Sequence, residues 1–395
     1  MHRDRALTVL ALVLASLLGA CSDNDPDTEP ADGMSTTTAA VPAAQLVFNG
    51  QGNDLAAYST EAPFEGQVVI EHNSDENPDG LDINGQICFD PDDPQRFIAG
   101  EDTFQSTTGE PGWGVFELTG STIGELAATQ VAELVPTYQP EQNGAENFGC
   151  GFLADGRVVT TDIGNQATGD ANGQLIVWFG PFEGTEIAYC KVDVTIGTAQ
   201  SILVDGDAVY VASARGGGVH RYDATTFPTS DTADGGCDST DGTGAPFATG
   251  IARTVFIAGD ETNGIATAAG IARGPGGNLF VSSVFNGVIA EFTPDGTFVR
   301  HVLQPPAGEA LGEEPYSTGT PLGIGVASDG TLYYADIGIV ITADGIGPGS
   351  GTGTVRRIRF LDGEPQPPET LDDGLAFPDG IGIYEPSRST GSSSP

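Results

Sequence analysis

The clearest pattern of apolar and polar positions lies between Gly270 and Val302, where four short apolar segments follow one another. These segments cover Gly270–Arg273, Asn278–Ser283, Gly287–Phe292 and Thr297–Val302. The residues between them are Pro275-Gly276-Gly277, Phe285-Asn286 and Pro294-Asp295-Gly296, which are typical of tight turns. The pattern predicts four antiparallel strands in series. Such a unit is too small to bury both of its faces alone, so it needs a neighbour on each side.

Copies of this unit recur along the chain. They begin at Gly85, Gly149, Ala199, Pro321 and Phe377, and the last one ends after a single strand. When the copies are aligned, Gln86 and Gln200 occupy the column in which the other copies have glycine. From Gln45 onward the pattern contains no convincing amphipathic helix, which predicts an all-β fold.

The incomplete last copy needs three more strands, and the N-terminal region supplies them. Alternating segments occur at Gln45–Asn49, Leu55–Ser59 and Gln67–His72. Pairing both ends of the chain in one sheet closes a ring and removes its free edges. The sequence therefore predicts a six-bladed β-propeller over residues 45–386. A β-sandwich or a β-helix is the alternative, but the four-strand unit and the split last unit favour the propeller.

The N-terminal residues have the features of a targeting segment. Arg3 and Arg5 precede an apolar run from Ala6 to Ala20, which is too short for a stable transmembrane helix but typical of a secretory signal. The run ends at Leu18-Gly19-Ala20-Cys21, which resembles a bacterial lipobox with Cys21 as the lipidated residue. We therefore expect a signal peptide over 1–20 and a disordered acidic and Thr/Ala/Pro-rich tether over 21–44. We also expect a disordered tail over 387–395. The alternative is an ordinary signal peptide followed by a chance cysteine.

The charge of the chain limits its partners. The sequence has 14 basic and 55 acidic residues, which gives a formal net charge of −41. Such a balance repels nucleic acid and anionic membrane surfaces, and it favours solubility and cation binding. We therefore expect no nucleic-acid partner, and we expect most of the carboxylates to form a solvated surface.

Beyond Cys21 the chain has four cysteines, an even number that indicates two disulfides outside the cytoplasm. None of them are spaced as in zinc motifs. In the aligned copies, Cys150 shares the column of Ile271 and Cys88 lies one column further on. Successive strand residues point to opposite faces, so this offset directs the two sulfurs of adjacent blades toward each other. We predict the pairs Cys88–Cys150 and Cys190–Cys237, with buried free thiols as the alternative.

The copy that begins at Pro321 reads Pro-x-Gly-Ile, a short apolar strand, Asp-Gly, and then Leu-Tyr-Tyr-Ala-Asp. This pattern resembles NHL-repeat propellers, and it is similar to the gluconolactonase/regucalcin and strictosidine-synthase-like propellers. The resemblance covers about residues 45–386 and concerns the fold more than any activity.

This resemblance implies a divalent cation at the mouth of the central channel. The gluconolactonase-like propellers hold it with a Glu, Asn and Asp set at the starts of inner strands, and Asn84, Asn147 and Asp379 are the matching residues here. Oxygen ligands from different blades suit Ca²⁺. The Glu-Gly-Pro-x-Trp signature of that family is absent, because Glu65-Gly66 lacks the Pro and the Trp.

Other polar residues are expected to be structural. Asp162 and Asp336 end equivalent strands and should bond neighbouring backbone amides. No Gly-x-Ser-x-Gly motif occurs, and the histidines His72, His220 and His301 fall within or at the ends of predicted strands. We therefore predict no catalytic residue. The loops Asn73–Asp82, Asn165–Asn172 and Ile339–Gly353 should gather on the channel face, where binding sites are commonly built.

Two functions remain open at this stage. One is a membrane-anchored binding module that uses the channel face to hold a protein, a glycan or a small molecule. The alternative is a Ca²⁺-dependent lactonase or esterase of the gluconolactonase type. Both place the chain in the cell envelope, extracytoplasmic and bound to a membrane through lipid on Cys21. In a Gram-negative cell this is the outer membrane or the periplasm.

Replacing Cys21 tests the predicted anchor. Cys21→Ala should release the protein from membranes or block its maturation, because the thiol that receives the lipid is lost. Membrane fractionation and mass spectrometry of the mature protein provide the measurement. An unmodified Cys21 thiol in the mature wild-type protein would contradict the predicted lipidation.

Overall fold

The computed structural model describes residues 45–101, 112–136, 147–164, 173–215, 217–305, 319–342, 345–349 and 351–386. The predicted signal peptide, tether and tail lie outside these residues. Helical elements in the described ranges are 3₁₀ turns of three residues each, namely η2 (Ala224–Thr226), η3 (Ala233–Gly235) and η4 (Val284–Asn286). Across these same ranges, no helix is long and apolar enough to cross a membrane.

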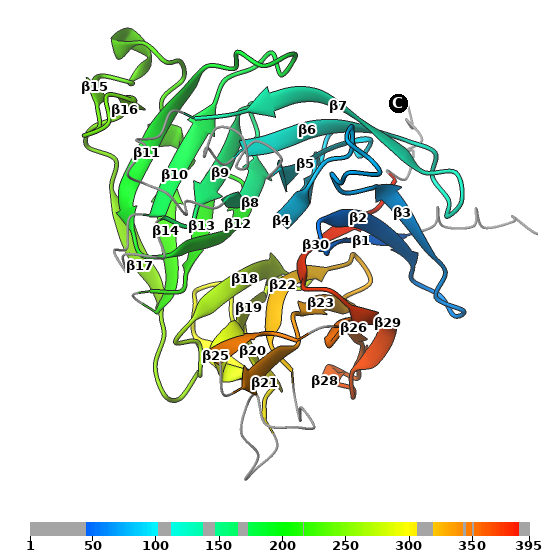
Figure 1. Cartoon of the computed structure of the whole chain (residues 1–395). Coiled ribbons are helices and arrows are strands. Elements are labelled where there is room, and N and C mark those ends of the chain that lie inside the picture. The colour runs from blue at the N-terminus through cyan, green and yellow to red at the C-terminus, as the bar shows by residue number, and fades with distance from the viewer. Residues whose placement is uncertain are drawn as a thin grey trace, which may run out of the picture. The chain divides into compact units, whose positions relative to one another are not determined.

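Six antiparallel sheets form the blades of a β-propeller, as the sequence predicts. Figure 1 shows their inner strands β4, β8, β12, β18, β22 and β30 next to one another. From the inner to the outer strand, blade one contains β30 (Pro378–Tyr384), β1 (Leu46–Gln51), β2 (Asp54–Ser59) and β3 (Gly66–Ile70). Blade two contains β4 (Ile83–Phe89), β5 (Arg96–Glu101), β6 (Gly112–Thr119) and β7 (Ala127–Leu134). Blade three contains β8 (Asn147–Phe152), β9 (Val158–Asp162), β10 (Gly173–Trp178) and β11 (Tyr189–Ile196).

The other three blades follow the same order. Blade four contains β12 (Ala199–Asp205), β13 (Ala208–Ser213), β14 (Gly218–Asp223) and β17 (Arg253–Ala258). Blade five contains β18 (Ala268–Arg273), β19 (Leu279–Ser283), β20 (Val288–Phe292) and β21 (Phe298–Leu303). Blade six contains β22 (Pro321–Val326), β23 (Leu332–Asp336), β26 (Gly353–Ile358) and β29 (Glu369–Leu375). Two hairpins extend blade six, β24 (Ile339–Thr342) with β25 (Gly345–Pro348), and β27 (Phe360–Leu361) with β28 (Glu364–Pro365).

Blade one combines the two ends of the described chain. Its inner strand β30 pairs antiparallel with β1, with Leu46 opposite Tyr384 and Phe48 opposite Gly382. The strands β1, β2 and β3 therefore complete a sheet whose fourth strand comes from the other end of the sequence. In the ring, β30 contacts β22 on one side and β4 on the other.

The hydrophobic core lies between the blades. Neighbouring residues on one strand point to opposite faces of the sheet, so each strand contributes to two cores. On β1, for example, Phe48 packs with Phe97 of blade two, whereas Val47 packs with Tyr333 of blade six. Each of the six blade-to-blade junctions has such an apolar cluster. Every sheet therefore needs both of its neighbours to bury its side chains.

Near the channel the blades approach each other through backbone rather than side chains. A Cβ atom placed on Gly270 would lie 2.6 Å from the carbonyl oxygen of Leu322 in the next blade. The same atom on Gly323 would lie 2.3 Å from the oxygen of Asp379, and on Gly380 only 1.6 Å from the oxygen of Gly85. These distances explain the glycine column of the repeat, because any larger residue would push adjacent inner strands apart.

Both predicted disulfides are confirmed. Cys88 on β4 and Cys150 on β8 are bonded, with their Cα atoms 5.9 Å apart, and they join the inner strands of blades two and three. Cys190 on β11 is bonded to Cys237, at a Cα separation of 6.0 Å. Cys237 belongs to the long connection between β14 and β17.

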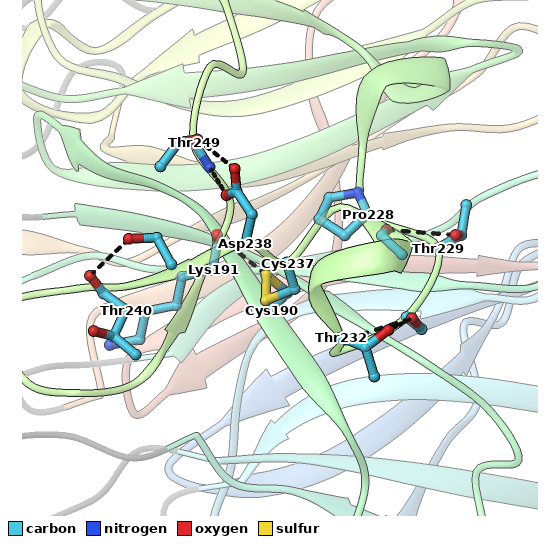
Figure 2. The surroundings of a disulfide bond; sticks show 12 residues. Cys190, Lys191, Pro228, Thr229, Thr232, Cys237, Asp238, Thr240 and Thr249 are labelled. Carbon is cyan, nitrogen blue, oxygen red and sulfur yellow. Dashed lines mark hydrogen bonds between the residues drawn. A yellow bond between two sulfur atoms is a disulfide. The ribbon is translucent and has the colours of Figure 1, made fainter.

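That long connection covers the outer edge of the preceding blade. Its short strands β15 (Ser239–Thr240) and β16 (Pro246–Phe247) join the sheet of blade three, where Phe247 pairs in parallel with Lys191. Figure 2 shows the Cys190–Cys237 bond beside Lys191, with the bond from Thr249 to Asp238 close by. The connection is thus held by a disulfide and by strand pairing to a blade other than its own.

A buried ion pair adds to this attachment. Lys191 is fully buried, and its Nζ lies 2.7 Å from Oδ2 of Asp241, whose side chain is 4% exposed. The other carboxylate oxygen of Asp241 accepts hydrogen bonds from the backbone amides of Thr243 (2.8 Å) and Ala245 (3.0 Å). The hydrogen bonds to Lys191 and Thr243 hold the pKa of Asp241 below its usual value, against the opposing effect of its burial. A buried charge with this many partners is well compensated.

The blade junction at Gly380 provides a stability test. Gly380→Ala would place a methyl group 1.6 Å from a carbonyl oxygen, so it should lower the free energy of unfolding by about 3 kcal/mol or more. The matched control is Gly276→Ala, where a Cβ meets nothing within 4 Å and no left-handed backbone is required. The control should be neutral or stabilising by up to about 1 kcal/mol. Urea unfolding of the three proteins measures both effects, and equal midpoints would contradict the close approach.

Candidate functional site at the channel mouth

We define the channel mouth as the end of the propeller at which the inner strands begin and the second strands end. Strand register makes this end regular from blade to blade. The first residue of an inner strand faces the last residue of its neighbour, as in the pairs Asn147–Asp162, Ala268–Ser283 and Pro321–Asp336. The mouth is therefore built from equivalent positions of all six blades.

The aspartates that end the second strands hold turns together, as predicted. Asp336 is 3% exposed and accepts hydrogen bonds from the backbone amides of Thr320 (2.7 Å) and Gly338 (3.1 Å). Asp162 is fully buried and accepts one from the amide of Gly164 (2.9 Å). These carboxylates connect the end of one strand to the start of the next.

Asn147, one of the three predicted metal ligands, lies between blades two and three. Its Nδ2 donates to the carbonyl oxygens of Glu101 (3.3 Å) and Gly112. Its Oδ1 is buried and receives no hydrogen bond from the part of the chain that the structure describes. Asn147 thus presents an acceptor that a cation or a donor group could satisfy.

Asn84 lies next to Asn147, although at a different position from the one predicted. The register places Ile83 opposite Glu101, so Ile83 occupies the entry position and Asn84 faces Gly100. The strand β4 contains one additional residue here, and Gly85 adopts a φ of +67°. A Cβ on Gly100 would lie 2.3 Å from Asn84 Oδ1 and 3.0 Å from Asn147 Cγ. The missing side chain of Gly100 thus leaves room for both amides.

Asp379, the third predicted ligand, lies next to Gly50, where a Cβ atom would be 2.5 Å from Asp379 Oδ1. Its Oδ2 accepts a hydrogen bond from the amide of Gly85 (2.7 Å) and its Oδ1 from that of Gly380 (2.5 Å). Burial raises the pKa of Asp379 to about 7, although these backbone hydrogen bonds act in the opposite direction. The carboxylate is therefore linked to the residue that follows Asn84, and the three predicted residues come from one side of the mouth.

Other candidate ligands and bases are scattered. Among the described residues, His, Cys, Asp and Glu side chains nowhere form a group of three or more that could hold a metal ion. His72 pairs with Asp54 at the outer edge of blade one (Nδ1 to Oδ1, 2.7 Å), and this hydrogen bond raises its pKa. His220 lies within β14, where burial lowers its pKa, and His301 contacts the carbonyl oxygen of Asn263 at 3.1 Å.

On each inner strand, the residue directly before the glycine column contributes to what we call the mouth ring. Its members are Gly85, Phe148, Gln200, Ala269, Leu322 and Asp379. Gln200 belongs here because Thr161 Oγ1 donates to its carbonyl oxygen (2.6 Å), just as Ser282 Oγ donates to that of Leu322 (2.7 Å). The prediction that Gln200 replaces a glycine of the repeat is therefore wrong. Ser201 occupies that column, and the true first residue of the strand is Ala199, opposite Ser213.

An apolar cluster spans the mouth from blades three, five and six. Phe148, Ala269 and Leu322 of the mouth ring pack together, with Ile163, Val284, Ile337 and Ile339 around them. These residues come from blades that are not all adjacent, so their side chains converge across the channel. Sequence patterns do not show this cluster, because each member is a single apolar residue at the end of a strand.

Deeper in the channel, Gln86 links three blades. Its Oε1 accepts hydrogen bonds from the amides of Ile202 (2.8 Å) and Cys150 (3.3 Å), and its Nε2 donates to the carbonyl oxygen of Ile202 (2.8 Å). The side chain thus both donates to and accepts from the backbone of Ile202, as a neighbouring strand would, and connects β4 to β12. Gln86 occupies the glycine column as predicted, but its structural role was not predicted.

Of the predicted binding loops, Asn165–Asn172 lies outside the described residues, and Ile339–Gly353 contains the hairpin of β24 and β25. The acidic loop Asn73–Asp82 is held by its own asparagines, with Asn73 Nδ2 donating to the carbonyl oxygen of Pro78 (2.9 Å). Beside it is a hollow of about 630 Å³ lined by Asp54, Val68, Glu71, His72, Ser74, Asp75, Glu76 and Asn77. This hollow shares no residue with the mouth ring.

Comparisons with known proteins agree with this fold. No family model matches the sequence, and no curated protein matches it either. A luciferin-regenerating enzyme of known structure has 12% identity and a TM-score of 0.51, covering 86% of this chain and 92% of its own. A nidogen/laminin complex gives 12% identity and a TM-score of 0.49, with coverages of 86% and 98%. Regucalcin from Agrobacterium tumefaciens, described as a calcium-binding protein, has 15% identity and a TM-score of 0.45, covering 74% of this chain and 78% of its own. At these identities the likeness concerns the fold alone.

Asp379 makes the stability of the protein depend on pH. Its pKa is about 7 in the folded protein, against 3.8 for an ordinary aspartate. Between these values the folded protein keeps a proton that the unfolded chain releases. The free energy of unfolding should therefore fall as the pH rises from about 4 to about 7. Since one pKa unit corresponds to about 1.4 kcal/mol, the fall can reach about 4 kcal/mol.

Urea unfolding at pH 5 and pH 8, with a chelator present, measures this difference. His72 has a raised pKa and contributes with the same sign, so the comparison with Asp379→Asn is the decisive one. The variant should lose most of the pH dependence of the wild type. A variant that keeps the full difference would show that Asp379 is ionised throughout.

Proposed function

We propose that this chain is an extracytoplasmic, lipid-anchored propeller that binds a ligand at its channel mouth. The observation that carries the proposal is the composition of the mouth ring. Phe148, Ala269 and Leu322 provide an apolar surface, Gln200 provides an amide, and Asp379 is the ring's one titratable side chain. Such a mixture of apolar surface and few polar groups is typical of binding sites.

Two further features support a location outside the cytoplasm. The two disulfides are of the kind that persists in oxidising compartments. The lipobox-like residues before Cys21 support an anchor at the start of the mature chain. The strongly acidic composition favours solubility there.

A second candidate function, a cation-dependent hydrolase, is favoured by one observation. The buried Oδ1 of Asn147 lacks a donor within the described residues, and Asn84 Oδ1 lies near it at Gly100. The Asn147 oxygen fits a hard cation such as Ca²⁺, which takes six to eight oxygen ligands. Asp379 fits less well, because each of its oxygens already accepts a backbone hydrogen bond. A bound cation would polarise a carbonyl group of a substrate.

Metal analysis of the purified protein, combined with a screen of ester and lactone hydrolysis, separates the two candidates. Our proposal predicts no turnover. It also predicts that small molecules which raise the melting temperature of the wild type lose this effect in Phe148→Ala. Turnover that is abolished both by a chelator and by Asn147→Leu would instead establish the hydrolase. Ligands that stabilise Phe148→Ala as much as the wild type would overturn binding at the mouth.

A further inference from the structure

Three buried polar atoms between blades two and three have no hydrogen-bond partner among the residues that the structure describes. They are Trp113 Nε1, Asn147 Oδ1 and Gln174 Oε1. The three residues are only 1%, 2% and 3% exposed, respectively. Buried polar groups in native proteins almost always have a partner, which is commonly an ordered water molecule where no protein group is within reach. These atoms therefore indicate a bound molecule.

Two of the three atoms come from blade three and are directed at blade two. Asn147 of β8 and Gln174 of β10 are both paired with Asp162, which lies between them on β9. Residues that are directly paired across neighbouring strands have their side chains on one face of the sheet. Ile176 lies two residues beyond Gln174, hence on the same face, and it packs in the apolar cluster shared with blade two. The side chains of Asn147 and Gln174 thus face blade two.

The third atom comes from the facing side of blade two. Trp113 packs in the same cluster as Ile176, and its ring centroid lies 6.3 Å from that of Trp178. On its own sheet Trp113 is paired with Gly100, and a Cβ atom on Gly100 would lie 3.0 Å from Asn147 Cγ. One N–H donor and two carbonyl acceptors are therefore brought into the same junction, each from the mouth end of its strand.

The hydrogen-bonding needs of these atoms define their ligand. The N–H group of Trp113 shares the junction with two acceptors but bonds to neither, which indicates a bridging group between them. Trp178 shows the alternative, because its Nε1 donates directly to Thr160 Oγ1 (2.8 Å). The bridging group must accept one hydrogen bond and donate two, as a water molecule does. A cation could contact both oxygens, but it would leave the indole N–H unpaired and would be repelled by its positive hydrogen atom.

We propose that a water molecule is bound between blades two and three, where it accepts a hydrogen bond from Trp113 and donates to Asn147 and Gln174. It completes the polar end of the junction whose inner strands are joined by the Cys88–Cys150 disulfide. The inference goes beyond the proposed function and does not depend on a ligand at the mouth. It assigns the Oδ1 atom of Asn147 to water, whereas the second candidate function assigns it to a cation.

The indole resonances provide a direct test, because the sequence has only two tryptophans. In a deuterated, ¹⁵N-labelled sample, the Hε1 proton of Trp113 should show a nuclear Overhauser effect to a long-lived water molecule. The Hε1 proton of Trp178 is the internal control and should show none, because it is bonded to Thr160. The variants Trp113→Phe and Trp178→Phe assign the two resonances. Absence of the effect at Trp113 would overturn the bound water.

Leucine variants test the two acceptors. Gln174→Leu and Asn147→Leu each remove one oxygen, so the effect at Trp113 should be weakened or lost. Asn147→Leu also removes the hydrogen bonds to Glu101 and Gly112, so Gln174→Leu is the decisive variant. The matched control is Gln366→Leu, just beyond β28 in blade six, which should leave the effect unchanged. An undiminished effect in Gln174→Leu would overturn the assigned partners.

Calcium titration distinguishes water from a cation. With water at this junction, any change in melting temperature between Ca²⁺ and a chelator should be the same in the wild type and in Asn147→Leu. Stabilisation by Ca²⁺ that the wild type shows and Asn147→Leu loses would overturn the assignment to water and favour the second candidate function. Binding at the mouth is tested separately by Phe148→Ala, so the two proposals can fail independently.

Discussion

The close approach of backbone between adjacent inner strands is the constraint on which the rest of this structure depends. At the glycine column, the carbonyl oxygen of one blade occupies the place where the preceding blade would carry a side chain. The blades can then lie close enough for their flat faces to share apolar clusters from the centre to the outer strands. The residues directly before and directly after this column on each inner strand therefore form two groups with different surroundings. One group enters the core between blades, and the other, the mouth ring, faces the channel.

The fold could be predicted from the sequence because the repeat unit cannot be stable without neighbouring units. Four strands with tight turns cannot bury both faces of their sheet alone. The last copy of the repeat has only one strand, and the N-terminal region has the three strands that complete its sheet. The Cys88–Cys150 disulfide followed from the alternation of strand faces, since the two residues differ by one position in aligned strands, and Cys190–Cys237 was the pair that remained. Strand ends such as those of β18 to β21 differ from the predicted ones by at most two residues.

The site was less predictable because its geometry depends on irregularities that alignment does not resolve. An additional residue in β4 moves Asn84 from the entry position to a place opposite Gly100. The connection from β12 to β13 is one residue shorter than its equivalents in blades three and five, which places Gln200 in the mouth ring. The meeting of Phe148 with Leu322 depends on the closed ring, so no local pattern contains it. The acidic composition also has a partly structural origin: Asp295 and Asp329 each accept a hydrogen bond from the amide two residues further on.

The attachment of the long connection to blade three has a chemical consequence for the whole protein. Lys191 is the single lysine of the sequence, and it is fully buried against Asp241. The folded propeller therefore offers no side-chain amine to reagents in solution, and amine-directed coupling or crosslinking leaves its blades unmodified. Acylation of Lys191 requires the connection to detach from β11. The rate at which this one amine reacts thus becomes an intrinsic reporter of how often that edge opens.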